Sequence, residues 1–173
     1  MQIYEDLQFI SGLASPNPAE REIWFSRLYE QYKNHVYSFL SYKLPPSEVA
    51  DVMQETFVAA WRGIAGFNRE ARLKTWILSI ARFKMADRYR KAREDISLYN
   101  IPEQAEVFDT AENMDLNQAL GCLKKDDREL LHLVYNLELT YAEIGSVLQV
   151  PPGTVKSRMS RIRGELKRIM EGG

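Results

Sequence analysis

The chain has 173 residues, with 23 Lys and Arg against 24 Asp and Glu, a formal net charge of −1 and 45% hydrophobic residues. This length suits one medium domain or two small ones, and the composition is typical of a soluble globular protein. The single cysteine, Cys122, excludes an internal disulfide. The N-terminus lacks the basic and apolar stretches of a signal peptide, and the apolar runs are far shorter than the roughly 20 residues of a membrane span. We therefore expect a cytoplasmic protein without membrane insertion.

Helices are predicted throughout the first half of the chain. The run Asn17-Pro18-Ala19-Glu20 combines a capping residue, a proline and a glutamate, and it predicts a helix start. Residues 44–47 (Leu-Pro-Pro-Ser) end this helix and supply the cap of a second one, which glycines interrupt at 63 and 66. A third helix begins near Asn68 and continues to about Arg93. Apolar residues recur at the helical spacing of three and four along the first of these helices: Trp24, Leu28, Tyr32, Val36, Phe39 and Leu40.

A second helical set follows an acidic segment. Residues 94–112 have no sustained period and carry only negative charge, which is typical of a linker. Thr140-Tyr141-Ala142-Glu143 is a capping box that starts a helix, and another helix follows Pro151-Pro152. Because no strand-like alternation is present, we predict an all-α fold of two small helical domains, residues 1–93 and 113–173. A flexible acidic linker over 94–112 joins them, and the second domain contains a helix-turn-helix.

The near-zero net charge hides a strong separation of charge along the chain. Residues 62–93 contain 10 basic and 2 acidic residues, and residues 151–173 contain 6 and 2, whereas residues 94–118 contain 7 acidic residues and no basic one. Two separate basic segments indicate two places that meet a polyanion. The last helix suits a DNA major groove, where Lys, Arg and hydroxyl groups bind phosphates and base edges. Periodicity alone also allows a helical hairpin with a solvated basic face.

The amino-acid sequence of the predicted helix-turn-helix is distinctive. Residues 140–145 (Thr-Tyr-Ala-Glu-Ile-Gly) and 152–163 (Pro-Gly-Thr-Val-Lys-Ser-Arg-Met-Ser-Arg-Ile-Arg) resemble region 4 of the extracytoplasmic-function (ECF) group of bacterial sigma factors. Gly145 stands where the family usually has alanine, which costs helix propensity, about 1 kcal/mol, but allows helices to approach closely. The resemblance implies contacts with the −35 promoter element by Thr154, Lys156, Ser157, Arg158, Ser160, Arg161 and Arg163.

An acidic helix in the first half resembles the same family. Residues 51–62 (Asp-Val-Met-Gln-Glu-Thr-Phe-Val-Ala-Ala-Trp-Arg) are similar to its region 2.2, which docks on core RNA polymerase. Asp51 and Glu55 are four residues apart and share one helix face. Without the resemblance, these two carboxylates also suit a solvated helix face. Acid–base catalysis would need a second reacting group, and none is visible in the sequence. The resemblance implies core-polymerase contacts by Asp51, Gln54, Glu55 and Phe57.

Residues 67–77 and 80–90 are similar to regions 2.3 and 2.4, with which the family reads and opens the −10 element. A loop before a basic helix suits this task, because a melted strand exposes bases for stacking while its backbone follows a cationic surface. Phe83 stands where asparagine is common in the family. Trp61 and Trp76 lie on apolar stripes and are predicted core residues, whereas Phe67 is the stacking candidate. The resemblance implies −10 contacts by Phe67, Asn68, Arg69, Arg72, Lys74, Arg82, Asp87, Arg90 and Lys91.

Together, the two resemblances imply a sigma factor that binds core RNA polymerase, recognises and melts promoter DNA and starts transcription. They imply no catalysis and no cofactor, and they imply an anti-sigma factor as a further partner. The alternative is a stand-alone helix-turn-helix regulator, which would concentrate its basic residues in one DNA-binding module. The larger basic excess lies in the first domain instead. The spacing of His35, Cys122 and His132 predicts no metal site. The sequence shows neither a phosphate-binding glycine loop nor a nucleophile elbow, so these motifs do not indicate an enzyme.

Overall fold

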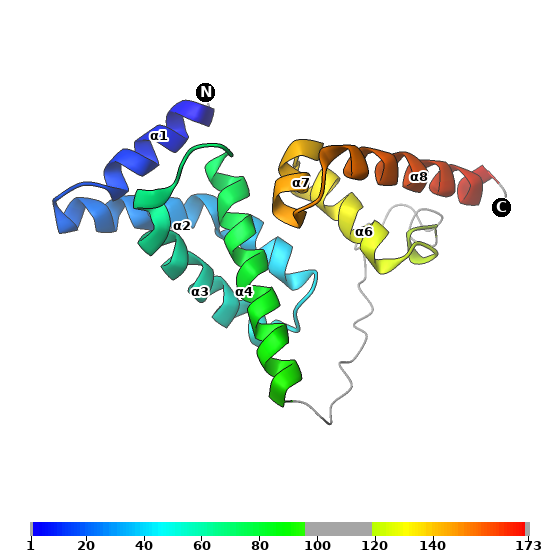
Figure 1. Ribbon diagram of the computed structural model, residues 1–173, viewed down its shortest axis with the longest axis horizontal. Coiled ribbons are helices and arrows are strands. Elements are labelled where there is room, and N and C mark those ends of the chain that lie inside the picture. The colour runs from blue at the N-terminus through cyan, green and yellow to red at the C-terminus, as the bar shows by residue number, and fades with distance from the viewer. Residues whose placement is uncertain (1, 96–118, 172–173) are drawn as a thin grey trace. The chain divides into compact units, whose positions relative to one another are not determined.

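The computed structural model describes residues 2–95 and 119–171. The chain divides into two compact units, Met1–Ile101 and Pro102–Gly173. Every regular element in the described ranges is helical (Figure 1), which confirms the predicted all-α fold. The first two residues of the expected linker, Glu94 and Asp95, continue a helix of the first unit. The rest of that segment, residues 96–112, lies outside the described residues.

The described part of the first unit contains α1 (Gln2–Leu13), α2 (Pro18–Ser41), α3 (Pro46–Gly63), a short 3₁₀ turn η1 (Ile64–Gly66) and α4 (Leu73–Asp95). The start of α2 is confirmed, because the Asn17 side chain accepts a hydrogen bond from the backbone N–H of Ala19 at 3.0 Å. The break before α3 is also confirmed, but its cap differs. Pro45 occupies the cap position and offers no side-chain acceptor. Pro46 follows at the first helical position, where the fixed φ of proline suits a helix.

Two features at the ends of these helices differ from the predictions. The helix α1 was not predicted, and α4 begins at Leu73 rather than near Asn68. The backbone turns instead of entering a helix there: the Asn68 side chain accepts a hydrogen bond from the N–H of Glu70 at 3.2 Å, and Arg69 has a left-handed φ of 63°. Residues 67–72 are therefore a loop between η1 and α4.

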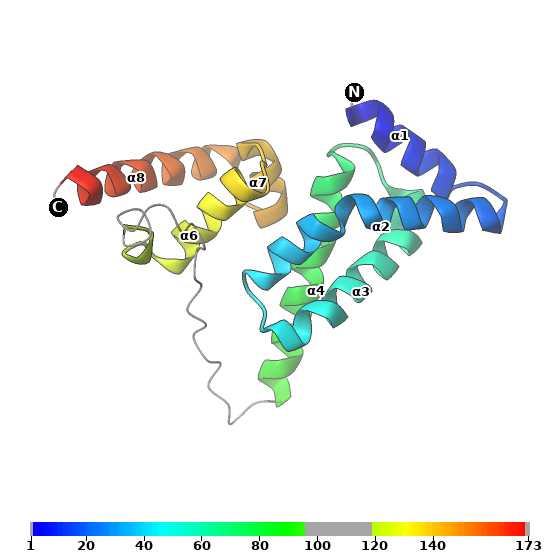
Figure 2. The same cartoon turned by 180° about the vertical axis from the view of Figure 1, so that it is seen from behind.

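The core of the first unit lies between α2, α3 and α4, and α1 packs against α2 (Figures 1 and 2). Val36 of α2, Val52 of α3 and Ile77 of α4 are completely buried. Each such side chain contributes about 1.5–3 kcal/mol relative to an exposed position. At Gly12 of α1, an added β-carbon would lie 2.2 Å from the ring of Trp24. The close approach of α1 to α2 therefore requires glycine at this position.

The described part of the second unit contains α6 (Lys125–Leu131), a π-helical turn η2 (His132–Asn136), α7 (Tyr141–Leu148) and α8 (Pro152–Glu171). The predicted capping box is confirmed. The Thr140 hydroxyl accepts from the N–H of Glu143 at 3.3 Å, and the Glu143 carboxylate accepts from the N–H of Thr140 at 2.8 Å. These two bonds satisfy backbone donors that would otherwise be unpaired at the start of α7.

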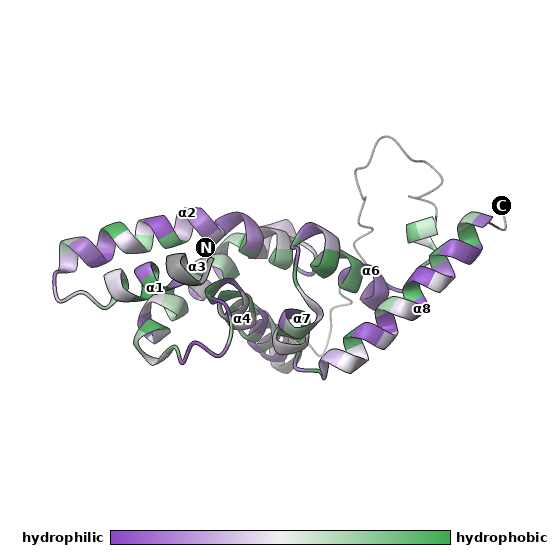
Figure 3. Cartoon of the chain, turned by 90° about the horizontal axis from the view of Figure 1, so that it is seen from above, coloured by the Kyte–Doolittle hydropathy of each residue, from purple (hydrophilic) through white to green (hydrophobic). Residues whose placement is uncertain are grey.

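The second helix of the helix-turn-helix, α8, is amphipathic as predicted. Val155, Met159 and Ile162 are buried to 0–1% exposure, and the colours of α8 in Figure 3 alternate between hydrophilic and hydrophobic along its length. At the turn before α8, a β-carbon on Gly145 would lie 2.8 Å from the carbonyl oxygen of Val150. The backbone after α7 therefore passes so close to Gly145 that a larger residue would clash with it, which is the close approach expected at this position.

Candidate functional site

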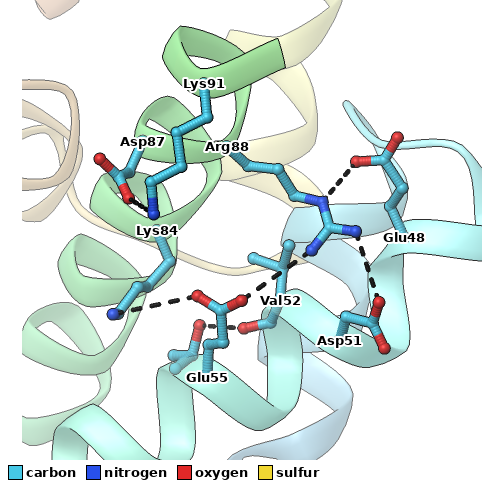
Figure 4. A network of polar contacts seen from close by, with 9 residues as sticks. Glu48, Asp51, Val52, Glu55, Lys84, Asp87, Arg88 and Lys91 are labelled. Atoms are coloured by element: carbon cyan, nitrogen blue, oxygen red, sulfur yellow. Dashed lines mark hydrogen bonds and ion pairs between the residues drawn. The ribbon is translucent and has the colours of Figure 1, made fainter. Parts of the chain in front are cut away.

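Three carboxylates on α3, Glu48, Asp51 and Glu55, form the acidic stripe, which faces two cations of α4 (Figure 4). The Arg88 Nε donates to Glu48 Oε2 at 2.8 Å and its Nη2 donates to Asp51 Oδ2 at 3.4 Å. The Arg88 Nη1 and the Lys84 Nζ each lie 3.9 Å from a carboxylate oxygen of Glu55. The side chains of Asp51 and Glu55 remain 63% and 52% exposed, so both can still reach a binding partner.

The two other residues expected to contact core polymerase differ from each other. Gln54 is exposed on α3, near the acidic stripe. Phe57 is only 2% exposed, and its ring packs against that of Tyr29 with centroids 4.8 Å apart. Its side chain lies on the apolar face of α3 and stabilises the helix that carries the stripe, and its contact with core polymerase stays a prediction.

The loop at residues 67–72 brings polar side chains to the surface just before α4. Asn68, Arg69 and Arg72 are exposed, as a DNA contact requires. Phe67 is 8% exposed because its ring packs against Trp76 with centroids 5.0 Å apart, and Lys74 is 9% exposed. The side chains of Phe67 and Lys74 are therefore largely covered, and their contacts with the −10 element stay predictions.

Aromatic side chains of the first unit divide into packed and exposed ones. Trp61 meets Phe25 edge to face with centroids 4.6 Å apart, and Trp76 packs on Phe67. Both tryptophans are nevertheless half-buried, not the fully buried core residues that were predicted. Phe83 of α4 is different, because its side chain is 68% exposed. Of the two departures from the family pattern, Phe83 thus lies on the surface, whereas Gly145 is buried.

The C-terminal half of α4 carries cations that a carboxylate holds together. Asp87 accepts from Arg90 Nη2 at 2.5 Å, and the Lys91 Nζ lies 3.0 Å from its other oxygen. The hydrogen bond from Lys91 and the charges of both cations lower the pKa of Asp87, so its carboxylate stays ionised near neutral pH. Arg90 and Lys91 are 69% and 70% exposed, while Arg82 is half-buried. A polyanion can therefore reach Arg90 and Lys91.

The first part of α8 exposes the polar side chains that a DNA groove would meet. Six of the seven residues expected at the −35 element are exposed, away from the buried stripe of the helix: Thr154, Lys156, Ser157, Ser160, Arg161 and Arg163. Their alternation of cationic and hydroxyl groups suits phosphate oxygens and base edges.

Asp127 of α6 pairs with two residues of that set, Arg158 and Arg161. This carboxylate is 2% exposed, and Arg161 donates from Nη2 to both of its oxygens, at 2.7 and 2.9 Å. The Arg158 Nη2 lies 3.4 Å from one of these oxygens. The side chains of Arg158 and Arg161 are still 34% and 50% exposed. Asp127 therefore joins α6 to α8 and fixes two guanidinium groups at the expected DNA surface.

Neither Arg88 nor Asp127 was predicted as a functional residue. A signal exists for Arg88, because Lys84 and Arg88 are four residues apart, as are Asp51 and Glu55, and such pairs share a helix face. No local signal exists for Asp127. Its partners follow 31 and 34 residues later, and its burial depends on the packing of α6 against α8.

No helix within residues 2–95 and 119–171 is long and apolar enough to cross a bilayer. In the same ranges, no group of three or more His, Cys, Asp and Glu side chains is arranged to hold a metal ion. The carboxylates described above pair with Arg and Lys side chains instead.

Comparison with known proteins places the chain among sigma factors. The family models that match are Sigma-70 region 2, over residues 28–94, and Sigma-70, region 4, over residues 113–166. The ECF RNA polymerase sigma factor SigW of Bacillus subtilis is 30% identical over 165 residues, covering 83% of this chain and 87% of that protein. The ECF RNA polymerase sigma-E factor of Haemophilus influenzae is 30% identical over 158 residues, covering 80% and 83%.

Solved structures share the fold. CnrH, in complex with the cytosolic domain of CnrY, matches with a TM-score of 0.64 and 24% identity, covering 96% of this chain and 97% of that chain. The sigma factor RpoE of Bartonella quintana, in complex with the anti-sigma factor NepR, matches with a TM-score of 0.61 and 23% identity, covering 85% and 96%.

Proposed function

Because the chain belongs to the extracytoplasmic-function group of RNA polymerase sigma factors, which direct promoter-specific transcription, we propose that its two units divide this task. Residues 1–93 dock on core polymerase and hold the melted −10 strand, and residues 113–173 bind the −35 duplex. The observation that carries the proposal is the exposed acidic stripe of α3, paired with the basic helix α4. A protein-binding and a DNA-binding surface thereby lie on neighbouring helices of one unit.

Core polymerase binds the exposed part of α3. Asp51, Gln54 and Glu55 are the contact residues, because their side chains are exposed on one helix. Arg88 and Lys84 approach the two carboxylates from behind at 3.4–3.9 Å, which orders them without neutralising them completely. Carboxylates in this arrangement suit a cationic partner surface, and charge complementarity favours both the rate and the specificity of association.

The melted −10 strand binds across the loop at residues 67–72 and along α4. Asn68, Arg69 and Arg72 offer hydrogen bonds to unpaired bases and phosphates, since all three are exposed. Further along α4 the backbone of the strand meets Arg82, Arg90 and Lys91, and Asp87 keeps the last two in place. Phe67, Lys74 and Phe57 act as supporting residues because they are buried.

The −35 duplex binds the exposed face of α8. Thr154, Lys156 and Ser157 lie in the first two turns of that helix, from which side chains reach base edges in a major groove. Ser160 and Arg163 follow on the exposed surface and suit phosphates. Arg158 and Arg161 contribute the free part of their guanidinium groups, in the orientation that Asp127 imposes.

The partners of the chain are then core polymerase, promoter DNA and an anti-sigma protein. The last assignment is supported by the structures of CnrH with CnrY and of RpoE with NepR, in which proteins of the same fold are held in complexes. The chain acts in the cytoplasm as an initiation factor that selects and opens promoters, and the polymerase performs the chemistry.

The proposal predicts that the isolated chain binds promoter duplex weakly, because a net charge of −1 gives no general attraction to a polyanion. With core polymerase both DNA surfaces are held at once, so the second contact becomes intramolecular and apparent affinity rises by about 10²–10⁴-fold. Fluorescence anisotropy with labelled promoter and run-off transcription on a promoter panel measure this. Nanomolar binding by the isolated chain at physiological salt, without promoter-dependent transcription on adding core, would favour the stand-alone regulator.

A further inference from the structure

Asp6 of α1 is a buried carboxylate that contacts the start of α4. Its side chain is 8% exposed, and it accepts a hydrogen bond from the backbone N–H of Leu73 at 3.0 Å. Its other oxygen accepts from the Tyr32 hydroxyl at 3.2 Å. Asp6 precedes Leu73 by 67 residues and lies outside the matched region 2, which begins at residue 28.

The contact with Leu73 has the chemistry of a helix cap. Leu73 is the first residue of α4, and the first N–H groups of a helix have no partner within the helix. A side-chain oxygen normally supplies that partner from the residue just before the helix. Here Asp6 supplies it from another helix, and its negative charge also interacts favourably with the helix dipole.

This cap fixes one end of the loop at residues 67–72. The other end is fixed by Phe67, whose ring packs on Trp76. Between these ends Arg69 has a left-handed φ of 63°, a conformation that a residue with a β-carbon adopts only when its surroundings impose it. The shape of the loop therefore depends on its two anchors.

The middle of the loop lies beside an open pocket. Leu7 and Ile10 of α1, together with Arg69, Glu70 and Arg72 of the loop, line a cavity of about 270 Å³ beside Asp6. Because this space beside the anchor is open, the loop has room to shift when the anchor is lost. A change at Asp6 is thus transmitted to Arg69 and Arg72.

The geometry points to Asp6 as a positioning residue for the −10 element: it holds the start of α4 and, through it, the base-reading side chains of the loop. This inference rests on the proposed function, in which Asn68, Arg69 and Arg72 contact the melted strand. Asp6 itself does not touch DNA. Its loss should therefore change which −10 bases are preferred, and should leave −35 preference unchanged.

The test uses the full chain with core polymerase, on promoters changed base by base at each element. For Asp6→Ala, we expect discrimination between the best and the next-best −10 base to fall about fivefold, the effect of losing a helix cap. Asp6→Asn keeps a neutral acceptor and should lie between this variant and the unchanged chain. Tyr32→Phe is the matched control, because it removes the other hydrogen bond of Asp6 and leaves the contact with Leu73.

A structural role alone would lower transcription by the same factor on every promoter, and this outcome would overturn the inference, as would an unchanged −10 profile in folded Asp6→Ala and Asp6→Asn. If Asp6→Ala does not fold, Asp6→Asn decides. The double variant Asn68→Ala with Arg69→Ala separates the positioning role of Asp6 from the proposed −10 contact of the loop. If this variant shifts −10 preference while the Asp6 variants do not, only the role of Asp6 is contradicted. If it also leaves the profile unchanged, the proposed −10 contact fails.

Discussion

Replacing Asp51 and Glu55 together with alanine is expected to weaken binding to core RNA polymerase by about tenfold or more. Both carboxylates lie on one face of α3 and are more than half exposed, so they are available to cations on the polymerase. Arg88 and Lys84 hold them in place from the other side at 3.4–3.9 Å. The variant would lose the charged part of the docking surface and keep the apolar packing of the helix.

The same substitution should leave the fold intact. Exposed ion pairs contribute only about 0–1 kcal/mol each, and Arg88 retains its 2.8 Å contact with Glu48. The matched control is Glu22→Ala with Glu30→Ala, which removes two exposed carboxylates from α2 and breaks the 2.6 Å pair with Lys33. Titration of labelled core polymerase measures affinity, and thermal unfolding checks the fold. Equal affinity for the double variant and the unchanged chain, or equal losses in variant and control, would contradict the assigned docking surface.

Asp127→Asn is expected to destabilise the second unit and to weaken recognition of the −35 element. The substitution removes the charge that Arg161 meets at 2.7 and 2.9 Å and Arg158 at 3.4 Å. Hydrogen bonds to charged groups contribute about 1.5–3 kcal/mol. Both arginines are partly exposed and regain water when released, so we expect a loss of about 1–2 kcal/mol in unfolding free energy.

The effect on DNA follows from the same contacts. Released from Asp127, the two guanidinium groups can rotate, and any contact that they make with bases or phosphates loses its fixed geometry. Asp126→Asn is the control, because it removes the same charge from an exposed neighbour on α6. Chemical denaturation and transcription from −35 variants are the measurements. If Asp126→Asn and Asp127→Asn behaved alike in both, the clamp between α6 and α8 would have no role.

Local sequence patterns are sufficient for much of this fold. The caps at Asn17 and Thr140 are correct because both depend on residues within a few positions of one another. The buried stripe of α8 is correct because a helix places every third or fourth residue on the same side. The distinctive run in residues 152–163 also identified the family, and the matched regions confirm it.

The features that were missed depend on contacts between distant segments. The helix α1 lacks a recognised cap, although Leu7, Ile10 and Leu13 recur at a spacing of three, a weak form of the helical pattern. The roles of Asp6 and Asp127 depend on partners 67 and 34 residues away. Phe67 was predicted as the stacking candidate, yet its ring packs against Trp76 of the next helix and is largely buried. Burial of this kind is set by tertiary packing and has no local signature.

Exchange of the two DNA-reading segments tests the central claim, that each unit reads one promoter element. Residues 67–74 and, separately, residues 153–163 are replaced by those of a relative with a different promoter preference. Transcription is then measured with core polymerase on promoters altered in one element at a time. The first graft should change −10 preference and leave −35 preference unchanged, and the second should do the reverse. If either graft shifted preference at the other element, the division of promoter recognition between the two units would be contradicted.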